Sequence, residues 1–111
     1  MPSVKDTARF RAFQVIGCVA CRQRGIYSQA DVHHLLSGGR RRGHRATVPL
    51  CVWHHRGGTP DGMTAKDATW VYGPSLARGP KTFRAEFGDD EKLLRVTDAA
   101  LAAIEYTGDV K

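Results

Sequence analysis

The side chains best suited to chemistry in this sequence are three cysteines and five histidines, and all of them lie between positions 18 and 55. They form a Cys-x-x-Cys motif, a His-His pair, a single histidine and a Cys-x-x-His-His motif. Thiolates and imidazoles at such short spacings are the usual ligands of transition metals, above all zinc. The pattern indicates one metal site that stabilises the fold and a second that does chemistry.

The Cys-x-x-Cys and Cys-x-x-His motifs predict a structural zinc site whose ligands are Cys18, Cys21, Cys51 and His54. Two ligands three positions apart can point inward from one tight turn, and a second such pair completes a tetrahedron. The set uses every cysteine in the chain. An odd number of cysteines does not suit a disulfide framework. The alternative is that the cysteines are buried free thiols, which also occur inside reduced proteins.

The charge of the chain points to a polyanionic partner. Lysine and arginine number 17 against 11 acidic residues, the sequence pI is about 9.7, and Arg40, Arg41, Arg42 and Arg45 lie close together. Clustered arginine at high pI is typical of nucleic-acid-binding proteins. For this cluster alone, an inert solvated surface is an equally good interpretation, and the neighbouring metal motifs favour DNA.

Hydrophobic periodicity and turn residues predict the elements that must position these side chains. The first expected element is a helix over 7–15, with Asp6 as N-cap and an end at Gly17, and a knuckle over 18–21 follows it. We then expect a strand within 26–36, a loop over 37–45 and a returning edge strand or second knuckle over 48–51. A helical turn over 52–56 and helices over 81–87 and 89–105 complete the chain order. Asp89 is the expected N-cap of the last helix. We expect both Trp53 and Trp70 to be core aromatics.

Length and composition predict one small α+β domain over residues 1–111, with a metal-stapled core at about 17–60 and a C-terminal helical part at about 80–106. A core of this size is small, so a structural metal would contribute much of the stability. The chain starts with polar residues and has no apolar run long enough for a bilayer. We therefore expect a cytoplasmic protein without a signal peptide and without a membrane partner.

The order CVAC, DVHHLL, GHRATVPL and CVWHH resembles the HNH (ββα-metal) endonucleases. More narrowly, the stretches GCVACR, VHHLLSGGRRRGHRATVPLC, WHHRG and GPSLARGPKTF resemble the phage recombination-enhancement (Ref) family of RecA-dependent nucleases, over about residues 17–90. This resemblance implies a zinc-stapled ββα-metal core with flanking helices and metal-dependent hydrolysis of DNA phosphodiester bonds. It also implies a RecA nucleoprotein filament as a partner and a bacterial or phage-encoded protein.

The resemblance further implies roles for the histidines. His33 and His55 would bind a catalytic divalent metal, and His34 would be the general base that deprotonates water. The family pattern has asparagine at a middle position, and this sequence contains none; His44 is the nearest replacement and Thr47 the second. His44 would either orient the loop or be a third ligand. Three imidazoles would favour Zn²⁺, and two leave Mg²⁺ or Mn²⁺ open. His54 and His55 can also exchange roles.

Phosphate contacts are expected from Arg40, Arg41, Arg42 and Arg45, and from Arg78 and Lys81 in the GPSLARGPK stretch. Two other functions compete with a nuclease. A non-catalytic zinc-ribbon-like DNA-binding module would not need His33, His34 or His55. A protein-interaction zinc domain would not need the basic loop. The number of bound metal ions separates these functions, because a nuclease needs a second ion beside the structural zinc and either competitor needs one.

Overall fold

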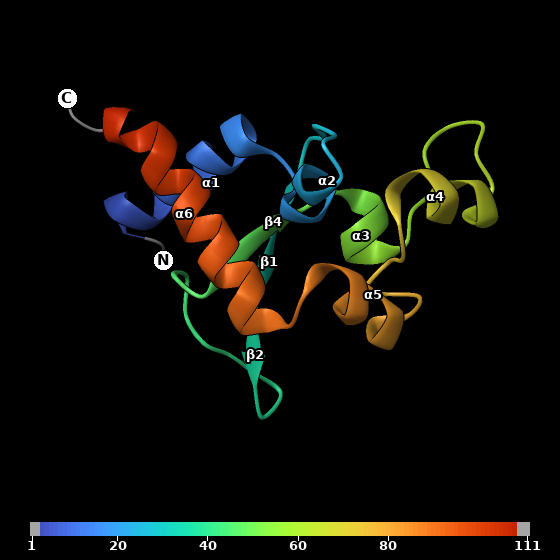
Figure 1. The fold of residues 1–111 in the computed structure, drawn as a ribbon. Coiled ribbons are helices and arrows are strands. Elements are labelled where there is room, and N and C mark those ends of the chain that lie inside the picture. Colours follow the sequence, from blue (N-terminus) through green and yellow to red (C-terminus); the bar gives the residue numbers. More distant parts are fainter. Residues whose placement is uncertain (1–2, 109–111) are drawn as a thin grey trace.

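A computed structural model describes residues 3–108 of the chain, and its side chains through residue 104. In this small α+β fold, helices pack around one short antiparallel sheet, and a second short antiparallel sheet extends away from them (Figure 1). In chain order the elements are α1 (Val4–Ile16), α2 (Val19–Gln23), β1 (Asp31–His34), β2 (Leu36–Ser37), β3 (Arg40–Arg41), β4 (Thr47–Leu50), α3 (Val52–Arg56), α4 (Ala65–Tyr72), α5 (Pro80–Phe87) and α6 (Asp90–Gly108). None of these helices is both long and apolar enough to cross a bilayer.

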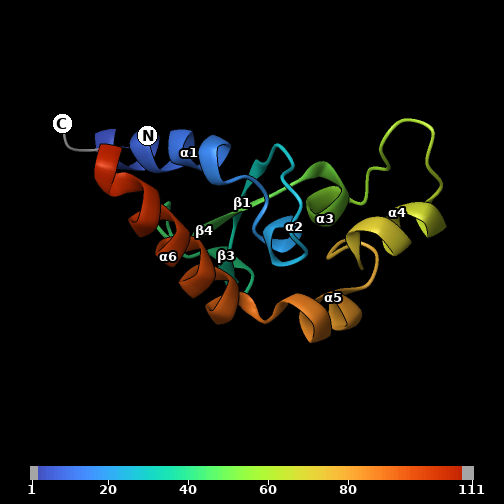
Figure 2. The ribbon, with the colours of Figure 1, turned by 45° about the horizontal axis from the view of Figure 1, so that its top comes forward.

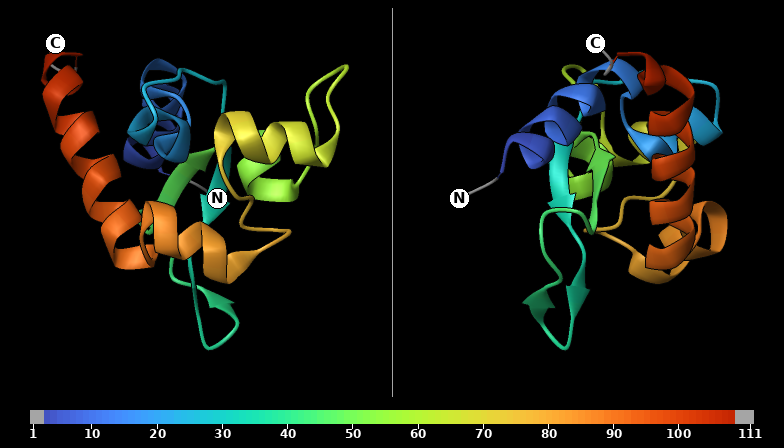
Figure 3. Two further views of the ribbon diagram at one scale, coloured as in Figure 1. Left: turned by 45° about the vertical axis from the view of Figure 1, so that its right-hand side comes forward. Right: turned by 90° about the vertical axis from the view of Figure 1, so that its left-hand side faces the viewer.

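Strands β1 and β4 form an antiparallel ribbon that carries the adjacent histidines, with His33 opposite Val48 and His34 opposite Thr47. In the described residues β4 pairs only with β1, so Pro49 lies in an edge strand as expected. The ribbon continues as β2 and β3, which we call the arginine hairpin (residues 36–41). It projects from the body of the molecule (Figure 3).

The turn of the arginine hairpin consists of two glycines, whose φ angles are 59° and 82°. Two successive positive φ angles are what a type I′ hairpin turn requires, and glycine adopts them without steric cost. Arg40 and Arg41 therefore lie in a strand. The expected loop over 37–45 is wrong for these two residues and for Ser37 of β2, because the glycine pair closes a hairpin where a plain strand break was expected.

Helix α1 begins earlier than expected because its N-cap is Ser3. The hydroxyl of Ser3 accepts a hydrogen bond from the backbone N–H of Asp6 (3.1 Å), and the Asp6 carboxylate accepts one from the N–H of Ser3 (3.0 Å). The two bonds form a capping box, so Asp6 is its third helical residue and not the cap. At the other end, Gly17 (φ 73°) stops the helix as expected. Asp89 caps α6 as expected, since its carboxylate accepts from the N–H of Lys92 (2.9 Å).

The hydrophobic core has two parts. The larger part surrounds the cysteine-rich segments and includes buried side chains from α3, β4, α5 and α6, among them Leu50, Trp53, Phe83, Phe87 and Leu93. The smaller part joins α1 to α6 through Phe13, Ile16 and Ala100. Figure 2 shows α1 next to α6, and the two helices are in contact. Helix α6 thus contributes buried side chains to both parts of the core, Leu93 to the larger and Ala100 to the smaller.

Trp53 is buried as expected, but Trp70 is 85% exposed, so the expectation of a core residue is wrong there. The reason is the geometry of α4. Ala68 is the buried residue of this helix, and two positions along an α-helix rotate the side chain by about 200°. Trp70 therefore points away from the core.

Gly17, directly before Cys18, allows a test of how closely the chain packs at the start of the cysteine knuckle. A Cβ there would lie 2.7 Å from the Tyr27 ring and 2.8 Å from the Ser28 carbonyl oxygen. That carbonyl is held in place by the Cys18 N–H at 2.9 Å. Gly25 has a similar φ, 77°, but nothing lies within 4 Å of a Cβ there. Gly25→Ala should therefore cost about 1–2 kcal/mol through backbone strain alone, and Gly17→Ala should cost more. Urea denaturation of both variants measures the difference, and equal losses would contradict the close approach.

Candidate metal centre and active site

The four side chains predicted to bind zinc converge in the structure. The Nδ1 atom of His54 lies 3.3 Å from the sulfur of Cys51, 3.4 Å from that of Cys18 and 3.6 Å from that of Cys21. The sulfurs of Cys21 and Cys51 are 3.9 Å apart. Zinc bonds of about 2.3 Å to sulfur and 2.0 Å to nitrogen give tetrahedron edges of roughly 3.8 Å and 3.6 Å. The cluster therefore matches the size of a tetrahedral Cys₃His site and can hold a metal ion.

The local backbone explains why the motifs form this cluster. Cys18 and Cys51 are the N-cap residues of α2 and α3, so each begins a helical turn that brings its partner alongside. The Cys18 sulfur accepts from the N–H of Cys21 (3.4 Å), and the Cys51 sulfur accepts from that of His54 (3.5 Å). The Ser28 hydroxyl donates to the Cys21 sulfur at 3.2 Å. Such donors stabilise thiolates, which are the form that binds a metal.

The orientation of His54 is fixed from outside the cluster. Its Nε2 lies 2.8 Å from the carbonyl oxygen of Tyr72. A carbonyl can only accept, so Nε2 carries the proton and donates it. In the neutral ring the lone pair is then on Nδ1, which faces the sulfurs. This is the arrangement of a metal-ligating histidine. The structure places His54 in the cluster and His55 outside it.

The protonation of the cluster favours a cation at its centre. Burial, reinforced by the neighbouring thiols, raises the pKa of Cys18 far above its usual value. Hydrogen bonds from Cys18 and then Cys21 lower the pKa of Cys51 far below its usual value. Burial alone would lower the pKa of His54, but the Cys21 and Cys51 sulfurs outweigh it and raise that pKa to about 9. Without a metal, buried protons must balance the thiolate charge, and a divalent cation would replace them.

A second group of polar side chains lies between β1 and α3. The rings of His33 and His55 are edge to face, with their centroids 4.9 Å apart. The Asp31 carboxylate lies 3.5 Å from Nδ1 of His55 and 3.4 Å from Nε of Arg56. The contact to His55 is an ion-pair distance and too long for a good hydrogen bond. Nδ1 of His55 is therefore a buried polar atom without a hydrogen-bond partner among the described residues.

The side chains of this second group are of types that bind divalent ions, but among the described residues only the Cys₃His cluster brings three or more ligand atoms close enough together to hold one. Two imidazoles and one carboxylate suit Zn²⁺ or Mn²⁺ better than an all-oxygen site would. Burial, with a smaller effect from the His55 ring, lowers the pKa of His33 to about 4. His33 is consequently neutral at physiological pH, with a lone pair to offer. In the second imidazole, that of His55, Nδ1 is the nitrogen without a hydrogen-bond partner in the described part of the chain.

His34 lies on the opposite face of β1, because successive side chains of a strand point to opposite sides. Its Nε2 is 3.2 Å from Nδ1 of His44, and both rings lie against Phe10 of α1. Burial and then the charge of Arg41 lower the pKa of His34. The histidines thus form two pairs, His33 with His55 and His34 with His44. The structure does not bring His44 into contact with the first pair. A contact within the loop comes from Thr47, whose hydroxyl donates to the His44 backbone carbonyl at 2.6 Å, while the His44 ring contacts His34.

The predicted phosphate-binding residues differ in how available they are. Arg40 and Arg41 are exposed on the arginine hairpin, and Arg45 is exposed near the start of α1. Arg42 is paired with Glu91 of α6 at 2.6 Å. The Nε of Arg78 donates to the Gly57 carbonyl at 3.0 Å, and its guanidinium lies over the Trp53 ring. Lys81 is exposed at the start of α5.

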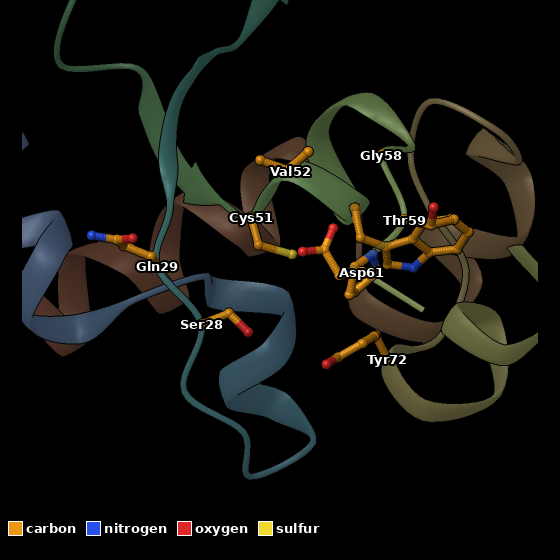
Figure 4. A pocket seen from close by; sticks show the side chains of 10 residues that line it. Ser28, Gln29, Cys51, Val52, Gly58, Thr59, Asp61 and Tyr72 are labelled. Atoms are coloured by element: carbon orange, nitrogen blue, oxygen red, sulfur yellow. The ribbon is translucent and has the colours of Figure 1, made fainter. Parts of the chain in front are cut away.

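A cavity of about 420 Å³ opens beside the metal cluster (Figure 4). It reaches Cys51, which is 8% exposed, whereas the other three ligands are fully buried. Its only charged lining residue is Asp61, and none of the paired histidines lines it. The cavity is therefore poorly suited to a phosphate and lies apart from the proposed chemistry.

Sequence reasoning missed Asp31 as a site residue. The signal was present, because Asp31 and His33 are two positions apart on a strand and so share a face. Their shared side faces α3 and its His55.

One protein-family model, described as recombination enhancement, RecA-dependent nuclease, matches residues 2–102. The match extends beyond the motif-bearing stretch on both sides. It includes α1, both histidine pairs, the Cys₃His cluster, the arginine hairpin and most of α6.

We predict that the Cys₃His cluster binds one Zn²⁺ and that the domain depends on it. Structural zinc sites contribute on the order of 10–16 kcal/mol, which is comparable to the stability of a whole domain. Cys21→Ser should therefore lose the zinc and unfold. His55→Ala is the matched control, because His55 follows the ligand His54 in sequence but lies outside the cluster. It should keep this zinc and its circular dichroism spectrum. A folded Cys21→Ser protein with full zinc content would contradict the assignment.

Proposed function

The chain belongs to the recombination-enhancement, RecA-dependent nuclease family, and on this premise we propose that it is an HNH-type endonuclease that hydrolyses DNA phosphodiester bonds. In this proposal β1, β4 and α3 are the two strands and the helix of a ββα-metal unit. The Cys₃His cluster is its structural zinc site. The observation that carries the proposal is the approach of His33 on the ribbon to His55 on α3, with Asp31 beside them.

His33 and His55 would hold the catalytic divalent ion, with Asp31 either as a further ligand or as the group that orients His55. When bound, the ion supplies positive charge that stabilises the pentacovalent phosphate and the leaving 3′ oxygen. The low pKa of His33 supports its part, because a ligand must be unprotonated.

The pair of His34 and His44 would supply the general base. Water attacks the phosphorus atom, the bond from phosphorus to the 3′ oxygen breaks, and the proton of the water must go to a base. The lowered pKa of His34 keeps it neutral and able to accept that proton. The hydrogen bond to His44 decides which nitrogen can accept it. Nε2 of His34 and Nδ1 of His44 are 3.2 Å apart, and a single proton lies between them. We assign the base role to His34, held by His44. Of two neutral rings, the one that donates the shared proton keeps a free lone pair on its other nitrogen, so this assignment has His34 donating from Nε2 and accepting the water proton at Nδ1. If His44 donates instead, its Nε2 is the free nitrogen and His44 is the base.

The arginine hairpin would bind the DNA backbone beside this site. Arg40 and Arg41 are exposed on a two-stranded projection, and a ribbon of this kind can lie along or within a DNA groove. Contacts from arginine to phosphate position the DNA without reading its sequence. A RecA filament as the partner that directs cleavage follows from the family description and belongs to the same proposal.

The nuclease proposal is tested by nicking of supercoiled plasmid with added Mg²⁺, Mn²⁺ or Zn²⁺, with and without RecA filaments. His33→Ala should lose cleavage and bind the second ion more weakly. His34→Ala should slow cleavage by about 10²–10⁴-fold and bind that ion normally. His44→Gln, measured in parallel, identifies the base.

Full activity of the His34 variant with loss in the His44 variant would transfer the role to His44. Full activity of all three variants would sink the mechanism, and a wild-type protein that binds one ion and nicks nothing would favour the non-catalytic DNA-binding module.

Salt dependence of DNA binding tests the arginine hairpin. Each lost phosphate contact should reduce the slope of log K against log salt by about 0.9, so Arg40→Ala/Arg41→Ala should reduce it by about 1.8. Arg42→Ala should have a smaller effect, because Glu91 already neutralises this side chain. The charge-matched control is Arg11→Ala/Arg95→Ala, which removes two exposed arginines from α1 and α6. Equal slopes in the two double variants would remove the hairpin from the interface.

A further inference from the structure

Trp70 is an exposed aromatic residue that the proposed cleavage chemistry does not use. Its side chain is 85% exposed, on a helix at the end of the molecule away from both termini (Figure 1). An indole ring has a large apolar surface, and leaving it in water forgoes the stabilisation that burial would give. A single exposed apolar residue is common, so exposure alone does not assign a role.

The backbone beneath Trp70 is held from two sides. Arg24 donates to the carbonyl oxygens of Trp70 (3.2 Å) and Val71 (3.1 Å), and both oxygens of Glu86 fix its guanidinium. The next carbonyl, that of Tyr72, accepts from His54 of the metal cluster at 2.8 Å. These contacts fix the C-terminal end of α4. Trp70 is therefore an exposed ring on a rigid support, and little conformational entropy would be lost when a ligand contacts it.

The surroundings of the ring are polar and contain two cationic side chains and one carboxylate. Trp70 lines a surface hollow of about 740 Å³ together with Arg24, Lys66, Asp67 and Thr69. The Asp67 carboxylate is turned back to the N–H of Thr64 in a capping box, and Arg24 is committed to Glu86. Among the described residues Lys66 has no ion-pair partner. It lies one helical turn before Trp70, on the same side of α4.

We propose that Trp70 and Lys66 bind single-stranded DNA, with a base stacked on the indole ring and Lys66 against the adjoining phosphate. The inference rests on the proposed function and names an unpaired strand as part of the substrate. Aromatic rings beside cationic side chains are the usual means of binding single strands, because every base has a face to stack and every nucleotide a phosphate. In a duplex the base faces are already stacked on each other.

A protein partner is the competing occupant, and the lining of the hollow argues against it. Tryptophan residues that dominate protein interfaces lie in desolvated pockets, ringed by contacts that exclude water. Here the four other lining side chains are all polar or charged. Charge complementarity, with a chain of formal net charge +6, favours a polyanion.

Tryptophan fluorescence tests the proposal with the full chain and an oligothymidine, without added divalent metal, so that cleavage does not enter the result. Trp53 is the internal reference, because it is buried with its Nε1–H donating to the Gly73 carbonyl at 2.8 Å. We expect the oligonucleotide to quench Trp70. Trp70→Ala should abolish the quenching and weaken single-strand binding by about 5- to 150-fold, and Trp70→Phe should keep most of the affinity. Lys66→Ala should reduce the salt slope by about 0.7.

Val15→Ala is the control for loss of an exposed apolar side chain, since Val15 is 63% exposed on α1. It should bind the oligonucleotide as the wild-type protein does. Unchanged single-strand affinity in Trp70→Ala would overturn the proposal. So would a defect confined to binding of RecA filaments, which would make the occupant a protein. His33→Ala should still be quenched, so a failure of the nuclease chemistry and a failure of this site give different results.

Discussion

The Cys₃His cluster is the constraint on which the rest of the structure depends. It joins the start of α2 to the start of α3, which are 30 residues apart in the chain when measured from Cys21 to Cys51. Through Nε2 of His54 it also fixes the end of α4. Because His55 follows His54 directly, the hydrogen bond from His54 to the Tyr72 carbonyl, which orients the His54 ring, also sets the position of the His55 ring. The approach of His55 to His33 is therefore a consequence of the metal cluster, and the chemistry proposed for α3 cannot be separated from the stability of the fold.

Because successive side chains of β1 point to opposite sides, the adjacent histidines His33 and His34 have different surroundings and different proposed roles. His33 faces α3 and contacts His55, whereas His34 faces α1 and contacts His44. The proposed metal ligand and the proposed base are thus adjacent in sequence but held by different partners on different faces of one strand. Each keeps a lowered pKa, and burial is the largest cause for both. A scissile phosphate would have to lie at the end or edge of the strand to meet both rings.

The local parts of this structure were predictable, and the long-range parts were not. The ligand set of the cluster follows from spacing within two short turns, and the strand over the histidine pair follows from its position between turn residues. The pairing of Arg42 with Glu91 joins side chains 49 positions apart, so no local pattern contains it. Helix α4 was missed although Thr64 and Asp67 form a capping box, because the apolar run that ends it includes the exposed Trp70. Asp31 was missed because the interpretation of this motif rested on its histidines and did not include the residue two positions before His33, which shares its face of the strand.

The distribution of charge around the proposed site gives the metal ion a second role. The chain is basic as a whole, but three of its eleven acidic residues lie near the place where the phosphate would be cleaved. Asp31 lies beside His55, the charge of Asp90 acts on His33, and Glu91 neutralises Arg42. These carboxylates would repel a phosphate placed between the arginine hairpin and α3. A divalent ion at His33 and His55 would reverse the sign of the local charge. In the proposed arrangement the exposed arginines would gather DNA at the surface regardless of the ion, and only the metal-loaded site would tolerate a phosphate close enough to cut.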